Sequence, residues 1–132
     1  MTFAVFFALA IGGAFGAICR HLLSTFVKVI TDERWFSAAL ATVCVNMSGC
    51  FITGLTAGLI GDGGASSHAQ LWLILGTGLI GGYSTFSTAV LDAVDLMRNR
   101  HIFTGVALAF GILFAGIGMA LLGLTLTGYF AK

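Results

Sequence analysis

The stretch GTGLIGGYSTFSTAV, residues Gly76–Val90, interrupts a long segment that carries no charge. It holds four glycines, two serines and three threonines. Glycine weakens a helix by about 1 kcal/mol relative to alanine, and hydroxyl side chains compete for backbone hydrogen bonds. The stretch therefore predicts a helix that is broken near Gly81–Ser84.

The composition around this stretch is that of an integral membrane protein. Of 132 residues, 58% are hydrophobic and only 8% are charged, whereas a soluble domain is about one-quarter charged. The few charges separate four apolar runs, and each run reaches the roughly 20 residues that a membrane-spanning helix needs. The sequence predicts an all-α membrane protein with one domain, residues 1–132, and helices over about residues 3–27, 36–60, 71–93 and 102–130.

Several other classes of protein are disfavoured. The first run lacks the basic start of a signal peptide, so it is predicted to be a true transmembrane helix. The net charge of +1 argues neither for nor against nucleic acid, but no basic patch with interleaved aromatic residues is present, so no nucleic-acid partner is expected. No pair of carboxylates lies within an apolar run, which argues against an enzyme. The three cysteines, with no CxxC spacing, are expected to be small buried hydrophobic residues.

Two polar side chains in the first two helices are candidates for function. Arg20 lies about two-thirds along the first helix, where it either anchors the helix at the interface or draws an anion toward a vestibule. Asn46 lies near the middle of the second helix, and Thr42 shares its face at helical spacing. A buried amide needs partners, so Asn46 either bonds another helix or lines a polar path.

The break itself has two kinds of group that can meet ions. Irregular backbone at membrane depth is tolerated only where it is buried in protein or faces water. Its free carbonyls could hold a small cation, while Ser87 and Thr88 add hydroxyls. Phe86 lies among these hydroxyls, and a phenyl edge is electropositive. Phe86 is therefore either a packing residue or a ring edge beside an anion path.

Three motifs together resemble one family, the fluoride channels called Fluc or CrcB. They are GAFGAICRHLLS with its arginine, TVCVNMSGCFITG with its asparagine, and GTGLIGGYSTFST, which is similar to the family signature GGxSTFSTF. The resemblance covers essentially the whole chain. It implies a passive channel that exports cytoplasmic fluoride from a bacterial-type cell membrane and so gives fluoride resistance.

The resemblance also implies an assembly and a set of roles. Two subunits would insert in opposite orientations, with two pores along their interface and a structural sodium ion at the centre. By motif, the backbone carbonyls of Gly81 and Ser84 would hold the sodium. Phe86, Asn46 and Arg20 match residues of the fluoride path.

The chain departs from the family at three positions. Ala89 replaces a second phenylalanine, and the alignment places Gly116 and Ala120 where the family has a serine and a threonine that form a polar track. These substitutions predict that one pore is altered.

Charge placement bears on the same question. The links between the predicted helices are residues 28–35 (link one), 61–70 (link two) and 95–101 (link three). Links one and three carry four basic residues, whereas the termini and link two carry only one; the five are Lys28, Arg34, Arg98, Arg100 and Lys132. The basic side faces the cytoplasm, so both termini are expected outside. A bias of this size is typical of one half of a heterodimeric pair, and an ordinary homodimer remains the alternative.

Two alternatives to a conducting channel subunit stay open. One is a non-conducting or one-pore partner in a heterodimeric fluoride channel. The other is a small multidrug cation exporter, which would need a membrane-embedded carboxylate for proton exchange; the sequence places Asp92 and Asp95 only near the end of the third helix.

Overall fold

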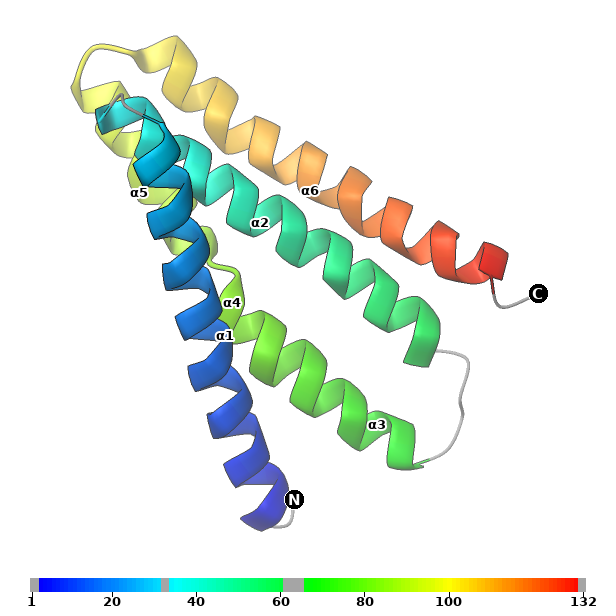
Figure 1. The fold of residues 1–132 in the computed structure, drawn as a ribbon. Coiled ribbons are helices and arrows are strands. Elements are labelled where there is room, and N and C mark those ends of the chain that lie inside the picture. Colours follow the sequence, from blue (N-terminus) through cyan, green and yellow to red (C-terminus); the bar gives the residue numbers. More distant parts are fainter. Residues whose placement is uncertain (1–2, 32–33, 61–65, 131–132) are drawn as a thin grey trace.

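The computed structural model describes residues 3–31, 34–60 and 66–130. Every regular element in these ranges is a helix, and Figure 1 shows their order along the chain. The elements are α1 (Phe3–Ile30), α2 (Arg34–Ile60), α3 (Ser66–Trp72), η1 (Leu73–Ile80), α4 (Gly81–Tyr83), α5 (Phe86–Arg98) and α6 (Ile102–Phe130).

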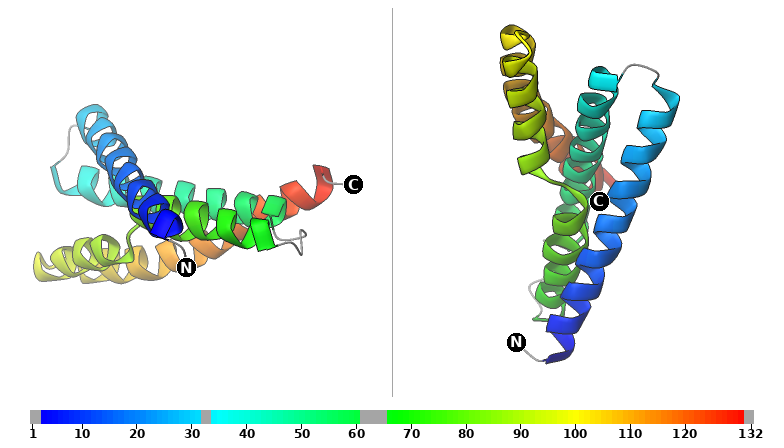
Figure 2. Two further views of the ribbon diagram at one scale, coloured as in Figure 1. Left: turned by 90° about the horizontal axis from the view of Figure 1, so that it is seen from below. Right: turned by 90° about the vertical axis from the view of Figure 1, so that its left-hand side faces the viewer.

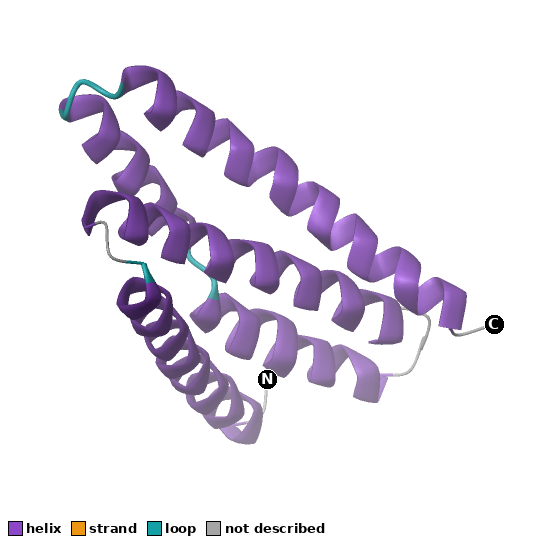
Figure 3. Ribbon diagram, turned by 45° about the horizontal axis from the view of Figure 1, so that its top comes forward, coloured by secondary structure: helices purple, strands orange, loops and turns teal. Residues whose placement is uncertain are grey.

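Within the described residues, four segments are long and apolar enough to cross a membrane: Phe3–Ile30, Ser37–Ile60, Ala69–Arg98 and Ile102–Gly128. This confirms the all-α membrane fold. The third span is a composite of α3, η1, α4 and α5, and Figure 3 shows a short non-helical turn near its middle. Its helical ends, Ser66 and Arg98, lie outside the expected residues 71–93. Apolar patterning detects only the part of a helix in hydrocarbon, and polar ends extend beyond it.

The helices form an antiparallel bundle in which α2 lies between α1 and α6 (Figure 2). The end of α1, the start of α2 and the α5–α6 connection lie at one end of the bundle, and the start of α1 and the end of α6 lie toward the other (Figure 1). The basic residues Lys28, Arg98 and Arg100 therefore belong to the same end. Lys132 and residues 61–65 of link two lie outside the described residues.

Glycines let the helix backbones approach closely. A Cβ atom on Gly16 would collide with the carbonyl of Leu79, and one on Gly82 would collide with the carbonyl of Gly13. On the other side of the bundle, a Cβ on Gly54 would strike the carbonyl of Ala120. Small residues at such crossings allow the van der Waals packing that holds helices together in lipid.

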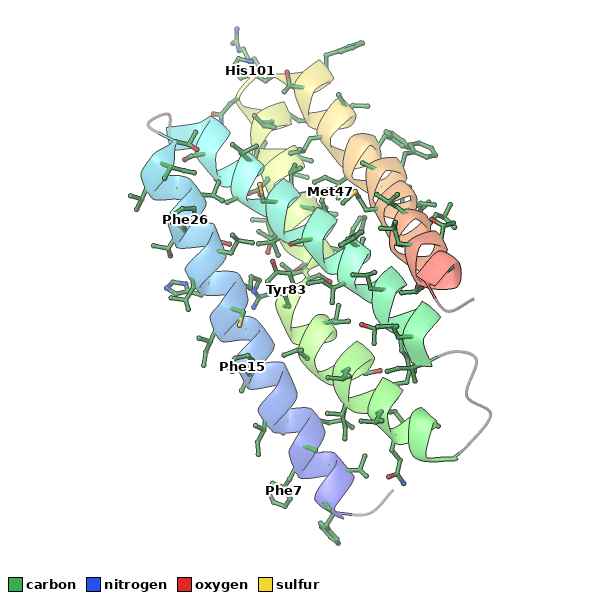
Figure 4. The ribbon with its side chains drawn as sticks, turned by 45° about the vertical axis from the view of Figure 1, so that its right-hand side comes forward. Phe7, Phe15, Phe26, Met47, Tyr83 and His101 are labelled. Atoms are coloured by element: carbon green, nitrogen blue, oxygen red, sulfur yellow. The ribbon has the colours of Figure 1, made fainter. Side chains whose placement is uncertain are left out.

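Large apolar side chains mostly point outward. Phe7, Phe15 and Phe26, labelled along α1 in Figure 4, are each about 60% exposed. The buried interior consists mainly of small side chains such as Ala41 and Val45. This arrangement is what a bundle in hydrocarbon requires, because lipid tails accept phenylalanine as readily as a protein core does.

Candidate functional site

The polar stretch breaks the third span at two residues. Ser84 and Thr85 have extended backbone angles, with φ/ψ of −87°/152° and −148°/116°. The Ser84 N–H still donates to the carbonyl of Ile80 at 2.9 Å. Among the described residues, no backbone N–H donates to the carbonyls of Gly81 or Ser84. The break thus lies where the glycines and hydroxyls predicted it, and it leaves backbone oxygens free.

A π-helical segment, η1, leads into the break, and the sequence pattern did not predict it. The Gly81 N–H donates to the carbonyl of Gly76, five residues back. The glycines remove side chains where α1 and the Trp72 ring come close; a Cβ on Gly78 would lie 3.2 Å from the carbonyl oxygen of Leu9. Such widened turns occur frequently at functional sites.

Asn46 connects α2 to the break. Its side chain is only 7% exposed, and its Nδ2 donates to the carbonyl of Thr42 at 2.9 Å and to that of Thr85 at 3.2 Å. One amide thereby satisfies a carbonyl of an extended residue that lies inside the bundle. The interhelical hydrogen bond that was one alternative for Asn46 is present, and the same side chain also borders a cavity.

Thr42 extends this polar connection to α5. Its hydroxyl lies within hydrogen-bond distance of an Asp92 carboxylate oxygen and of the carbonyl of Ala38. Because α5 continues to Arg98, Asp92 lies inside the helix and not at its end. Sequence reasoning missed the role of Asp92. The available signal was Thr42, four residues before Asn46 on the same face.

Three hydroxyls gather where α5 begins. The Thr85 Oγ1 lies 2.8 Å from the Ser87 Oγ, and the Thr88 hydroxyl reaches the Thr85 Oγ1 at 3.5 Å. Ser87 and Thr88 are exposed, and the Phe86 side chain between Thr85 and Ser87 is 63% exposed. The start of α5 therefore presents hydroxyls and one aromatic ring on the surface of the isolated chain.

A cavity of about 220 Å³ brings the charged and polar candidates together. Arg20 and Asn46 both line it, and the break contributes Thr85 and Thr88. No described residue accepts a hydrogen bond from Arg20 or forms an ion pair with it. Phe86 and Ser87 do not line this cavity; they lie on the exposed side of the same turn. The cavity is a polar chamber with a free cationic group, suited chemically to an anion.

Backbone oxygens are the metal ligands that the site offers. In the described ranges, no three His, Cys, Asp or Glu side chains gather. Gly81 is exposed and Ser84 is half-buried, and their carbonyls lack helical donors. Carbonyl oxygens suit hard cations.

The three departures from the family pattern lie in packed positions. Ala89 is 1% exposed inside the chain. A Cβ on Gly116 would lie 3.1 Å from the Cys50 Sγ and 3.7 Å from the Met47 Cε, and Figure 4 shows Met47 between α2 and α6. Ala120 lines an apolar groove of about 260 Å³ between the same helices. This face of the chain carries little of the polarity found around Arg20.

Comparison with known proteins gives consistent matches. The family described as "CrcB-like protein, Camphor Resistance (CrcB)" matches residues 7–124. A "Fluoride-specific ion channel FluC 1" from Leifsonia xyli subsp. xyli is 38% identical over 97% of this chain and 90% of its own length. A "Fluoride-specific ion channel FluC 2" from Rhodococcus jostii is 37% identical over 89% of this chain and 94% of its own length.

A third relative extends the range of organisms. The "Fluoride-specific ion channel FluC" from Thermus thermophilus is 34% identical over 90% of this chain and 91% of its own length. The matches span the arginine, asparagine and hydroxyl-rich motifs, so they confirm the resemblance that those motifs indicated. The chain belongs to the CrcB-like protein family.

Proposed function

We propose that this chain is a subunit of a passive, fluoride-selective channel in the plasma membrane of a bacterial cell. The channel exports cytoplasmic fluoride and so gives fluoride resistance. Membership of the CrcB-like family and relatives named fluoride-specific ion channels support this function. The observation that carries it is the cavity in which a free Arg20 faces Asn46 and the polar break.

The site supplies the steps that anion passage needs. The Arg20 guanidinium, with its several N–H donors, attracts the anion into the chamber. The Thr88 hydroxyl at the chamber wall can donate to the ion as it loses water. The exposed Phe86 ring then presents its electropositive edge, which can contact the anion without an intervening water molecule.

A second subunit in the opposite orientation completes this proposal. Gly81, Ser87 and Thr88 are exposed at the middle of the third span. Free carbonyls and hydroxyls cannot face hydrocarbon without a cost of several kcal/mol per unsatisfied group. Another protein surface must therefore cover the break, and a second chain that places its own break against this one would satisfy both.

The proposed cofactor is a sodium ion at the centre of the dimer. The free carbonyls of Gly81 and Ser84 fit such an ion, because they are oxygen ligands that no backbone donor occupies. When bound, the ion would link the two breaks and balance their partial negative charge. Its role in this proposal is structural.

The partner subunit is either a second copy of this chain or a different chain. Ala89 and Gly116 are buried within the chain, and Ala120 lines an apolar groove. A partner with an intact phenylalanine pair and hydroxyls would compensate for them in one pore. The basic bias toward one end favours a single orientation and thus a heterodimer, in which this chain is a one-pore or non-conducting partner. The family match gives no support to a cation exporter or an enzyme.

Fluoride efflux from liposomes tests the proposal. Purified protein, alone or with its partner subunit, is expected to dissipate a fluoride gradient and to leave a chloride gradient intact. Phe86→Ala is expected to lower the flux at least tenfold without loss of the folded protein. Phe110→Ala, which removes an exposed ring on α6, serves as the control. Absence of fluoride flux from every combination would refute the channel.

A further inference from the structure

Tyr83, the last residue of α4, forms a hydrogen bond to α2 that the proposed function does not use. Its hydroxyl lies 2.7 Å from the Oγ of Ser48. Figure 4 shows Tyr83 near the middle of the bundle, beside the point where the third span breaks. The bond joins the end of α4 to the neighbouring helix just before the chain becomes extended.

The direction of this hydrogen bond follows from the serine's other contacts. The Ser48 Oγ also lies 2.7 Å from the carbonyl of Cys44 and 3.1 Å from that of Val45. A serine hydroxyl has one proton and two acceptor lone pairs. Its proton goes to the carbonyls of its own helix, so the Tyr83 hydroxyl donates to Ser48.

Packing fixes the rest of Tyr83. On the α1 side, a Cβ on Gly16 would lie 2.8 Å from the Tyr83 backbone nitrogen. On the α2 side, a Cβ on Gly49 would lie 2.9 Å from the Ser84 Cβ and 3.4 Å from the Tyr83 Cδ1. Tyr83 is therefore held between the backbones of α1 and α2, with its hydroxyl bonded to the Ser48 side chain of α2.

Ser84 lies between two residues that α2 holds. Tyr83 is bonded through its hydroxyl to Ser48, and Thr85 is bonded through its carbonyl to Asn46. The Ser84 N–H keeps its bond to Ile80, but no described backbone N–H reaches the Ser84 carbonyl, so the anchored neighbours set the direction of that carbonyl. Removal of one anchor would let the Ser84 peptide plane rotate.

We propose that Tyr83 and Ser48 are a positioning pair that orients the Ser84 carbonyl of the break toward a bound cation. This inference rests on the proposed function, because the cation is the sodium ion proposed above. The pair does not contact the ion itself. It acts by holding the backbone on one side of Ser84, while Asn46 holds the other side.

The test compares Tyr83→Phe, Ser48→Ala and the double variant in two measurements. The first is amide hydrogen exchange at residues 84–88, which needs no ion flux. The second is the sodium concentration for half-maximal fluoride efflux, with sodium replaced stepwise by N-methylglucamine. Tyr83→Phe is expected to speed exchange and to raise the half-saturating sodium concentration about threefold, the size of one interhelical hydrogen bond.

The assigned proton direction predicts unequal effects. Ser48→Ala leaves the Tyr83 hydroxyl without an acceptor, whereas Tyr83→Phe leaves the Ser48 hydroxyl bonded to its own helix. Ser48→Ala is therefore expected to have the larger effect, and the double variant is expected to be closer to wild type than Ser48→Ala alone. Ser48→Thr keeps the acceptor oxygen and is expected to keep the half-saturating sodium concentration of the wild type.

The outcomes separate this inference from the proposed function. If the wild type passes no fluoride, the channel proposal fails, while hydrogen exchange still reports on the anchor. If the wild type conducts and Tyr83→Phe changes neither exchange nor sodium dependence, the positioning pair is refuted. Thr56→Ala, which removes only a bond to Ile52 within α2, controls for general loosening. Should Ser48→Ala fail to fold, Tyr83→Phe decides the question alone.

Discussion

At the scale of single residues, Asn46 has the most demanding position. It is buried, and its amide nitrogen bonds both its own helix and the extended Thr85. An asparagine in an apolar helix is costly unless its hydrogen bonds are made. Here those bonds also satisfy a carbonyl that the break would otherwise leave inside the bundle.

Replacement of Asn46 by alanine tests that role. Asn46→Ala is expected to lower the free energy of unfolding by about 1–2 kcal/mol, because the Thr85 carbonyl loses a donor inside the bundle. Equilibrium unfolding in detergent micelles measures the change. Thr56→Ala removes a hydroxyl that bonds only its own exposed helix turn. Equal stability of the two variants would contradict a structural role for Asn46.

At the scale of helices, the third span differs from the other three. The others are continuous helices of 27 to 29 residues, whereas the third divides into α3, η1, α4 and α5. Its glycines serve two purposes. Gly78 allows α1 to pass close to η1, and Gly82 allows α1 to pass close to α4.

The contact between α1 and α4 predicts a large effect from one added methyl group. Gly82→Ala is expected to destabilise the protein by about 1–3 kcal/mol, because the new Cβ would strike the Gly13 carbonyl and the backbone would have to shift. Gly111→Ala is the matched control, since a Cβ there meets nothing within 4 Å. Thermal unfolding of both variants in the same detergent measures the difference. A Gly82→Ala protein as stable as Gly111→Ala would show that the crossing is not tightly packed.

At the scale of the whole molecule, the isolated chain leaves its polar break uncovered. Gly81 and the hydroxyl-bearing start of α5 are exposed, although the surrounding span is long and apolar enough to cross a membrane. Because hydrocarbon cannot satisfy these groups, they support the proposed second subunit. The proposed assembly therefore rests on the same groups that are proposed to bind ions.

Crosslinking at the break tests the assembly. In a background with the three native cysteines replaced by alanine, Gly81→Cys is expected to form a disulfide-linked dimer in membranes. Gly128→Cys, near the far end of α6, is expected to stay monomeric. A homodimer would crosslink when this chain is expressed alone, whereas a heterodimer would need a partner with a matching cysteine. Failure to crosslink in both cases would contradict an interface at the break.

The amino-acid sequence alone determined the class of protein, the four spans, the position of the break and the family. These depend on transfer of side chains into lipid and on local backbone preferences, and both can be estimated from neighbouring residues. The motif spacing added Arg20, Asn46 and Phe86 as candidates. None of these inferences depends on how one helix is oriented against another.

Only the tertiary structure decided which polar groups meet. The Tyr83–Ser48 and Thr42–Asp92 bonds join residues 35 and 50 positions apart, and the π-helical turn of η1 arises where α1 approaches closely. Lipid tails are as apolar as the side chains that pack between helices, so hydropathy does not determine which side of a helix faces its neighbours. The rotation of each helix about its axis therefore depends on detailed packing and hydrogen bonds. That rotation determines which carbonyls of the break are bonded and which remain free.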